Sequence, residues 1–185
     1  DEWKEEAAKR GLNNFATTPE ALDVLGSKLA QDFYGKAGVM NKVELEAYHA
    51  VQLHNYCTKL HIEARSLEEL AHSMVMPAVL RYQTELAENI SAMKELDLDD
   101  AIGYQKDTLK RMVKNVAAIR EGLEKLQKAL EKSHEAESVR DEADILCHKV
   151  RPQMERIREA IDDLEAIVDD QYWPLVKYRE MLFMR

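Results

Sequence analysis

The sequence predicts an all-α protein: a long antiparallel up-down bundle of about four long helices, with short N-terminal helices and an aromatic C-terminal tail. Six glycines and four prolines among 185 residues are too few for the frequent turns of a sheet protein. Only four of these ten residues lie between Val39 and Tyr172, which indicates long helices with short connections. In this region apolar residues recur at steps of three and four, the spacing of one helical face.

The first part of the chain contains short elements. Thr18 is expected to be the N-cap of a short helix with Pro19 at its first position, and Gly35 and Gly38 to close this region. We assign residues 1–38 to an N-terminal linker and short helix, 39–170 to the long bundle and 171–185 to the aromatic tail, all within one structural domain.

Four long helices are expected to follow. Asn41 caps a helix that runs to about Ala64, and the capping-box pattern of Ser66 and Glu69 predicts a second helix to about Leu96. An acidic turn at 97–100 leads to a third helix that ends near His134. The fourth helix runs from about Ser138 to Asp169, and short turns make sequential helices antiparallel.

The third and fourth helices carry the clearest core stripes. Their apolar positions are Ile102, Leu109, Met112, Val116, Ile119, Leu123, Leu126 and Leu130, then Leu146, Val150, Ile157, Leu164 and Val168. Pro77 and Pro152 lie inside the second and fourth helices. Because proline has no amide hydrogen, we expect each of them to bend its helix.

Charge and composition exclude several classes of protein. Lysine and arginine number 26 against 35 aspartates and glutamates, a net charge of −9, so a nucleic-acid partner is not expected. No apolar run approaches the roughly 18 residues of a membrane span. The acidic N-terminus is unlike a signal peptide, and two cysteines are too few for a disulfide framework, so a cytoplasmic location is expected. The chain begins with Asp rather than Met, so we expect it to be a piece of a longer protein.

Long bundles include di-metal carboxylate proteins, whose ligands come from Glu-x-x-His pairs on facing helices. The chain contains three such pairs, Glu46 with His49, Glu69 with His72 and Glu131 with His134. With a turn near Arg65, the first two pairs lie nearly 20 Å apart in height, by the rise of about 1.5 Å per residue. That separation is too large for one di-metal centre, and Glu69 and Glu131 flank the core stripes. We therefore expect these side chains to be solvated.

A second candidate metal site combines His54, Cys57 and His61 with Cys147 and His148, since zinc accepts thiolates and imidazoles. Adjacent residues on a helix point about 100° apart, so Cys147 and His148 rarely face one ion. A core or interface stripe is the preferred interpretation and a zinc site the minor one.

Catalytic patterns are not evident either. A Cys57–His61 dyad lacks an orienting third group and an oxyanion hole, and the Gly35–Gly38 segment lacks the pattern of a P-loop. We expect no catalytic, cofactor-binding or metal-binding residue in this chain.

The terminal segments and a few internal ones are more distinctive than generic bundle sequence. The terminal ones contain Trp3, Arg10-Gly11-Leu12, Thr17-Thr18-Pro19-Glu20-Ala21-Leu22, Tyr172-Trp173-Pro174, Tyr178 and Met181-Leu182-Phe183, and the internal ones are His61-Ile62-Glu63-Ala64, Met76-Pro77-Ala78-Val79 and Arg81-Tyr82-Gln83. In this order, the series resembles the C-terminal region of type III glutamine synthetases over essentially the whole chain.

The resemblance implies a parent enzyme of the bacterial cytoplasm that makes glutamine from glutamate, ammonia and ATP with Mg or Mn. In that family the residues that bind ATP, metal and glutamate lie upstream, in the catalytic domain. The resemblance therefore implies a non-catalytic helical domain that is structural, oligomerising or regulatory and inactive alone. Its implied partners are the catalytic domain of the same polypeptide and neighbouring subunits of a large homo-oligomer, with no nucleic acid and no membrane.

The residues themselves also favour an interface. The helix that follows Asn41 is apolar on two stripes, one with Val43, Ala47, Ala50, His54, Cys57 and His61, the other with Leu45, Leu53, Tyr56 and Leu60. A bundle helix needs one inward face, so the extra stripe should cover another element or a missing domain. The tail adds Tyr172, Trp173, Tyr178, Leu182 and Phe183, which either dock on a partner or fold back on the bundle. The candidate interface is the second stripe together with these tail residues.

Two other interpretations stay open from the sequence. The first is a stand-alone bundle that acts as a binding or regulatory module, similar in outline to phosphate-signalling (PhoU-like) bundles. The second, a ferritin-like metalloenzyme, is more remote.

Overall fold

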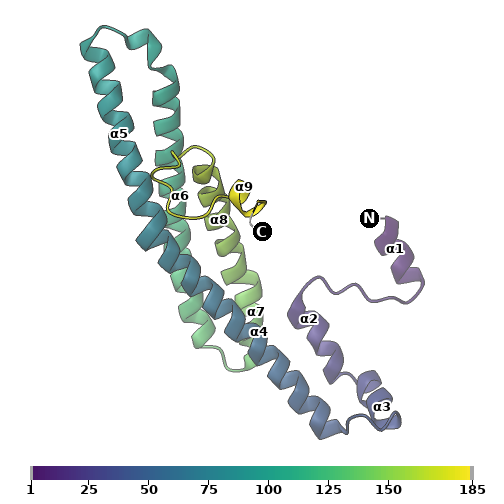
Figure 1. The fold of residues 1–185 in the computed structure, drawn as a ribbon. Helices are drawn as coiled ribbons and strands as arrows, with labels where there is room; N and C mark the ends of the chain where they lie inside the picture. Colours follow the sequence, from purple (N-terminus) through teal and green to yellow (C-terminus); the bar gives the residue numbers. More distant parts are fainter. Residues whose placement is uncertain (1, 184–185) are drawn as a thin grey trace. The chain divides into compact units, whose positions relative to one another are not determined.

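The computed structural model describes residues 2–183, and all regular structure in that range is helical, which confirms the all-α class. Short 3₁₀ turns lie at Val24–Gly26 and Asp99–Ala101. None of the described helices combines the length and apolar character needed to cross a bilayer. The α-helices of Figure 1 are α1 (Glu2–Lys9), α2 (Thr18–Asp23), α3 (Lys28–Lys36), α4 (Lys42–Leu70), α5 (Met76–Glu95), α6 (Gly103–His134), α7 (Val139–Ile145), α8 (Arg151–Glu165) and α9 (Tyr178–Met181).

The chain forms two compact units, each of which is described by itself. Unit 1 contains the residues up to His61 and Ala129–Lys149, and unit 2 contains Ile62–Lys128 and the residues from Val150 onward. In unit 2, the short connection between α5 and α6 folds them into an antiparallel pair, and α8 runs beside α6 (Figure 1).

The turn expected near Arg65 is not formed. Instead α4 continues through Ser66 to Leu70, and a π-helical turn at Ala71–Val75 joins it to α5. The expected first and second long helices are therefore one continuous helical segment. The capping-box pattern at Ser66 was misleading because such a pattern starts a helix only where the preceding chain is not helical. No glycine or proline precedes it after Gly38 to interrupt the helix.

The N-terminal caps of the other helices lie close to the expected positions. Asn41 caps α4, because its side-chain oxygen accepts from the Glu44 amide (3.0 Å) and its own amide donates to the Glu44 carboxylate (2.8 Å). Ser138 caps α7 through its hydroxyl, which accepts from the Asp141 amide (3.1 Å) and donates to the Asp141 carboxylate (2.6 Å). The cap of α2 is Thr17 rather than Thr18, and it forms a capping box with Glu20.

Each internal proline lies two residues after the end of a five-residue π-helical turn, at the second position of the next α-helix. Pro77 follows Ala71–Val75, and Pro152 follows Leu146–Val150. Proline has no amide hydrogen, and its ring crowds the carbonyl group four residues earlier. A π turn bonds five residues back instead, as the Met76 amide does to the Ala71 carbonyl, and its wider turn relieves the crowding.

The core stripes of α6 and of the α7–α8 segment lie where the periodicity placed them. Leu109 and Val116 are only half-buried. The fully buried members are Ile102, Met112, Ile119 and Leu126 from the first stripe and Leu146, Val150, Ile157 and Leu164 from the second.

Candidate functional site

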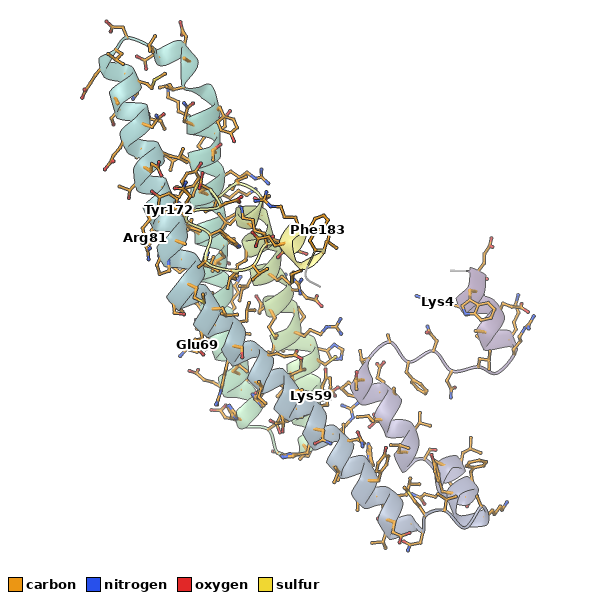
Figure 2. All side chains as sticks on the ribbon, viewed as in Figure 1. Lys4, Lys59, Glu69, Arg81, Tyr172 and Phe183 are labelled. Carbon is orange, nitrogen blue, oxygen red and sulfur yellow. The ribbon has the colours of Figure 1, made fainter. Side chains whose placement is uncertain are left out.

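The first part of the C-terminal tail packs on unit 2. Trp173 is buried, and the ring of Tyr172 lies 5.7 Å from that of Tyr82 on α5 (Figure 2). Lys177 is also buried, and its ammonium group donates to the Val168 carbonyl (3.0 Å). Half of the tail therefore folds back on its own bundle.

The end of the tail behaves differently. Leu182 is 65% exposed and Phe183 is 83% exposed. Phe183 lies at the far end of the tail from Tyr172 in Figure 2. The side chain of Tyr178, also a candidate interface residue, lies outside the described part of the structure. In the described part of the tail, large apolar side chains are thus exposed at Val176 and, in a group, at Met181, Leu182 and Phe183.

The two apolar stripes of α4 differ in burial. Leu45, Leu53 and Leu60 are buried and Tyr56 is half-buried, so the stripe assigned to the candidate interface is the inward one. Val43, Ala47 and Ala50 of the other stripe are exposed, and that stripe turns inward only at Cys57 and His61. The three leucines are therefore core residues in this structure and offer no free surface.

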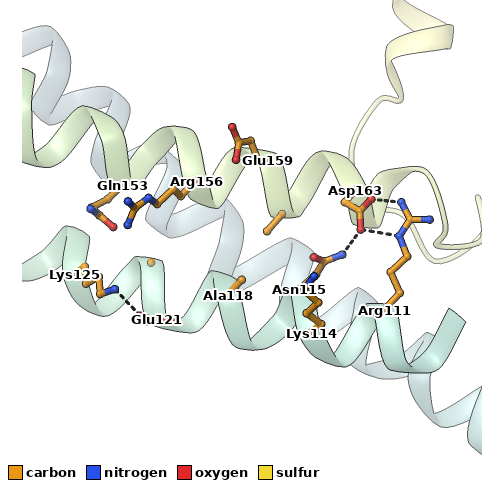
Figure 3. Close-up of a pocket in the computed structure, with 12 residues that line it drawn as sticks. Arg111, Lys114, Asn115, Ala118, Glu121, Lys125, Gln153, Arg156, Glu159 and Asp163 are labelled. Carbon is orange, nitrogen blue, oxygen red and sulfur yellow. Dashed lines mark hydrogen bonds and ion pairs between the residues drawn. The ribbon is translucent and has the colours of Figure 1, made fainter. Parts of the chain in front are cut away.

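Unit 2 contains a groove of about 720 Å³ between α6 and α8 (Figure 3). Its charged lining is nearly balanced, which does not favour a strongly charged ligand. The charged residues are Arg111, Lys114, Lys125 and Arg156 against Glu121, Glu159 and Asp163.

Contacts between the two helices set the shape of this groove. A Cβ atom added at Gly122 would lie 2.6 Å from Cγ1 of the buried Ile157, so α6 and α8 approach closely there because Gly122 has no side chain. At one end, the Asp163 carboxylate accepts hydrogen bonds from Arg111 (Nε, 2.8 Å) and from the Asn115 amide (Figure 3). Arg111, and to a lesser extent Asn115, hold the pKa of the Asp163 carboxyl below its usual value. The Asp163 carboxylate on α8 is therefore already hydrogen-bonded to residues of α6, and these bonds connect the two helices.

The Glu-x-x-His pairs do not come together as a di-metal centre. Glu46 and Glu69 both lie on α4, and 23 positions along one helix correspond to about 35 Å. His49 instead has its Nε2 atom 3.7 Å from a carboxylate oxygen of Asp23.

A different set of donor atoms meets in unit 1. His61 on α4, His134 at the end of α6 and Glu142 on α7 hold their nitrogen and oxygen donors within 4.8 Å of one another. We refer to these three residues as the histidine cluster. His61 Nε2 lies 2.8 Å from a Glu142 oxygen, and the two imidazole rings stack with centroids 4.6 Å apart. Among the described residues, this is the one group of three or more such side chains close enough to share an ion.

The sequence identified two members of the histidine cluster but in other combinations. His61 was grouped with Cys57, and His134 with Glu131. Glu142 was missed because an acidic residue in the first turn of a helix is ordinary there. Only the tertiary structure of unit 1 shows that these positions meet.

Cys57 lies one turn before His61 on α4 and is buried. Its thiol is 3.7 Å from the Val139 carbonyl. Burial, and secondly the negative charge of Glu142, raise the pKa of Cys57 to about 11. The thiol is therefore protonated and unreactive at neutral pH.

Comparison with known proteins gives a consistent result. The family described as "Glutamine synthetase C-terminal domain" matches residues 1–94. A "Glutamine synthetase" of Bacteroides fragilis (strain YCH46) is 34% identical over 189 residues, and a "Type-3 glutamine synthetase" of Dictyostelium discoideum is 33% identical over 188 residues. A "Glutamine synthetase" of Butyrivibrio fibrisolvens is 28% identical over 183 residues. Each match covers at least 99% of this chain but 26% of the relative, so the chain spans about a quarter of these proteins.

Proposed function

Because the chain belongs to the glutamine synthetase C-terminal domain family, we propose that it is the helical C-terminal part of a type III glutamine synthetase and that its role there is structural or regulatory. The proposed parent activity is the ATP-dependent ligation of ammonia to glutamate, with Mg or Mn in the catalytic domain. The proposed location of the parent enzyme is the cytoplasm.

The observation that carries this proposal is the whole-chain match to a quarter of each relative. The remaining three quarters of such a protein have room for the residues that bind nucleotide, metal and glutamate. The geometry of unit 2 agrees with a structural role, because the Asp163 carboxylate in its groove is already satisfied by Arg111 and Asn115. A group held in this way stabilises helix packing rather than awaiting a substrate.

The proposed partners are the catalytic domain of the same polypeptide and neighbouring subunits of a large oligomer. The exposed end of the tail, Leu182 and Phe183, is one surface that such a partner would cover. A second is the exposed stripe of α4 that begins at Val43, and α3 also exposes Leu29 and Phe33. Exposed large apolar side chains are typical of interaction surfaces where they form a contiguous patch.

The test uses the full-length enzyme with Leu182→Asp and Phe183→Asp combined. We expect a smaller assembly in size-exclusion chromatography with light scattering, and a several-fold lower turnover in glutamine synthesis, because two carboxylates cannot be buried unpaired. Leu96→Asp is the matched control, since Leu96 is 67% exposed but lies in the α5–α6 connection.

An enzyme with both tail substitutions and unchanged size and turnover would show that the tail end is not an interface. A stand-alone regulatory module, the second candidate, predicts instead that the gene encodes no catalytic domain upstream. The isolated chain is expected to show no γ-glutamyl transfer.

A further inference from the structure

The histidine cluster of unit 1 has the composition of a metal site. Two imidazole nitrogens and one carboxylate oxygen form the ligand set of three-residue zinc sites, in which water takes the fourth position. Ligands at about 2.0–2.2 Å from one tetrahedral zinc ion lie about 3.4 Å apart. The donors of His61, His134 and Glu142 lie within 4.8 Å of one another, so side-chain rotations that shorten these distances by up to about 1.4 Å close them around an ion.

The side chain that must move is free to do so. The two imidazole planes are 9° from parallel, and an ion cannot lie in the planes of two stacked rings at once. One ring must therefore turn for both histidines to bind. His134 is the exposed member of the cluster and sits at the last residue of α6, so rotation of its side chain disturbs no core packing.

The other two ligands are held by the fold. His61 lies on the continuous helix α4, and side-chain contacts fix the start of α7, which carries Glu142. Ser138 caps this helix, and Arg140 forms a bidentate pair with Asp23 (2.8 Å) in addition to its pair with Asp144 (2.6 Å). A preformed pair of ligands lowers the entropy lost when an ion binds.

The hydrogen bonding of His61 is incomplete. Its Nε2 faces Glu142, whereas its Nδ1 is buried and has no hydrogen-bond partner among the described residues. An ion shared by His61 and Glu142 replaces the contact at Nε2, the ring nitrogen that faces the carboxylate. The side chains of His61 and Glu142 are 15% and 22% exposed, so a cation there is partly shielded from water and interacts more strongly with the carboxylate.

We propose that unit 1 binds one divalent transition metal ion of the zinc class through a ring nitrogen of His61, a ring nitrogen of His134 and the carboxylate of Glu142. Imidazole ligands select Zn²⁺, Co²⁺ or Ni²⁺ over Mg²⁺ and Ca²⁺, which prefer oxygen ligands. The ion ties α4, the end of α6 and α7 together, so it stabilises unit 1. This site is separate from the proposed role in a glutamine synthetase and does not depend on it.

The test uses the untagged 185-residue chain after treatment with a chelator. Titration with Zn²⁺ in a calorimeter should give one ion per chain, and a stoichiometric amount should raise the thermal unfolding midpoint measured by circular dichroism. Mg²⁺ at the same concentration should leave the midpoint unchanged. Co²⁺ should show the visible absorption bands of a four-coordinate site with nitrogen and oxygen ligands.

Variants assign the ligands. His134→Ala should weaken zinc binding at least about 100-fold while it keeps the helical content, because the His134 side chain is exposed. Glu142→Gln should also weaken zinc binding. His148→Ala is the matched control, since His148 is an exposed histidine of unit 1 outside the cluster, and it should bind zinc like the unchanged chain.

Four results would overturn the proposal, and the first three concern zinc binding. They are less than one zinc ion per chain at millimolar zinc, unchanged zinc affinity in His134→Ala, and an equal loss of affinity in His148→Ala. A sulfur-to-cobalt charge-transfer band would also overturn it, because it would assign Cys57 or Cys147 as a ligand in place of the stated set.

Discussion

The groove of unit 2 and the histidine cluster of unit 1 both bring polar side chains from separate helices together, but they differ in how far these groups satisfy one another. In the groove, the Asp163 carboxylate accepts hydrogen bonds from Arg111 and Asn115. In the cluster, Glu142 faces one nitrogen of His61, and the other nitrogen of that ring has no partner among the described residues.

This difference separates a structural contact from a capacity to bind. A carboxylate that already has charged and neutral donors gains little from a further ligand, because any newcomer must displace them. The cluster instead places the donors of two histidines and one carboxylate within 4.8 Å of one another, with no lysine or arginine among them. The groove therefore fits a brace between helices, whereas the cluster fits an ion site.

The largest expected effect concerns the packing that shapes the groove. Gly122→Ala should lower the free energy of unfolding by about 1–2 kcal/mol, although alanine favours the helix by about 1 kcal/mol. The new methyl group would lie 2.6 Å from the buried Ile157 side chain, so the helices must move apart. Chemical denaturation followed by circular dichroism measures the change.

Gly103→Ala is the control for this substitution, because nothing lies within 4 Å of a Cβ atom at that position of α6. It should be neutral or slightly stabilising. If Gly122→Ala proved equally harmless, close helix contact would not be what shapes the groove.

A smaller effect on stability is expected from Asp163→Asn, which removes the negative charge of the carboxylate that bonds Arg111 and Asn115. The folded-state pKa of Asp163 lies below its usual value of 3.8, so its contribution to stability is present above that value and is lost as the pH falls through the folded-state pKa. The substitution should therefore lower the thermal midpoint at about pH 7, and the difference should shrink below about pH 3.

Asp162→Asn is the neighbouring control, because Asp162 is exposed and its carboxylate pairs with Arg158 one turn away on the same helix (3.5 Å). A pH-independent effect of Asp163→Asn would contradict an electrostatic tie between α6 and α8.

The smallest expected effect is that of the Glu142 charge on the pKa of the neighbouring Cys57 thiol. Glu142→Gln should lower the pKa of Cys57, because the Glu142 charge opposes formation of the thiolate. The pKa should stay nearer to 11 than to the usual value of 9.0, since burial is the larger cause. The pH dependence of thiol alkylation in the metal-free chain measures it. A thiol pKa that does not move would show that the Glu142 charge does not act on Cys57.

Some features of the fold could be predicted from local sequence because their causes are local. Asn41 and Ser138 start helices through their own side chains, and the core stripe that includes Met112 and Ile119 follows from the helical period. The break at Ser66 failed as a prediction because a capping-box pattern inside a helix looks like one at its start. The sequence also left open which element each stripe of α4 covers, since periodicity identifies apolar faces but not their neighbours.

The sequence alone determined the all-α class, the positions of the later helices and the resemblance to type III glutamine synthetases, because composition, periodicity and terminal motifs are properties of the chain itself. Tertiary structure decided what distant residues do together. It buried Leu45 and Leu53 and exposed Phe183 at the end of the tail. It also brought His61 to His134 and Glu142, which lie more than 70 positions away in the sequence. Side chains so far apart in the chain meet only when helix packing fixes the distance between them, and no local pattern records that distance.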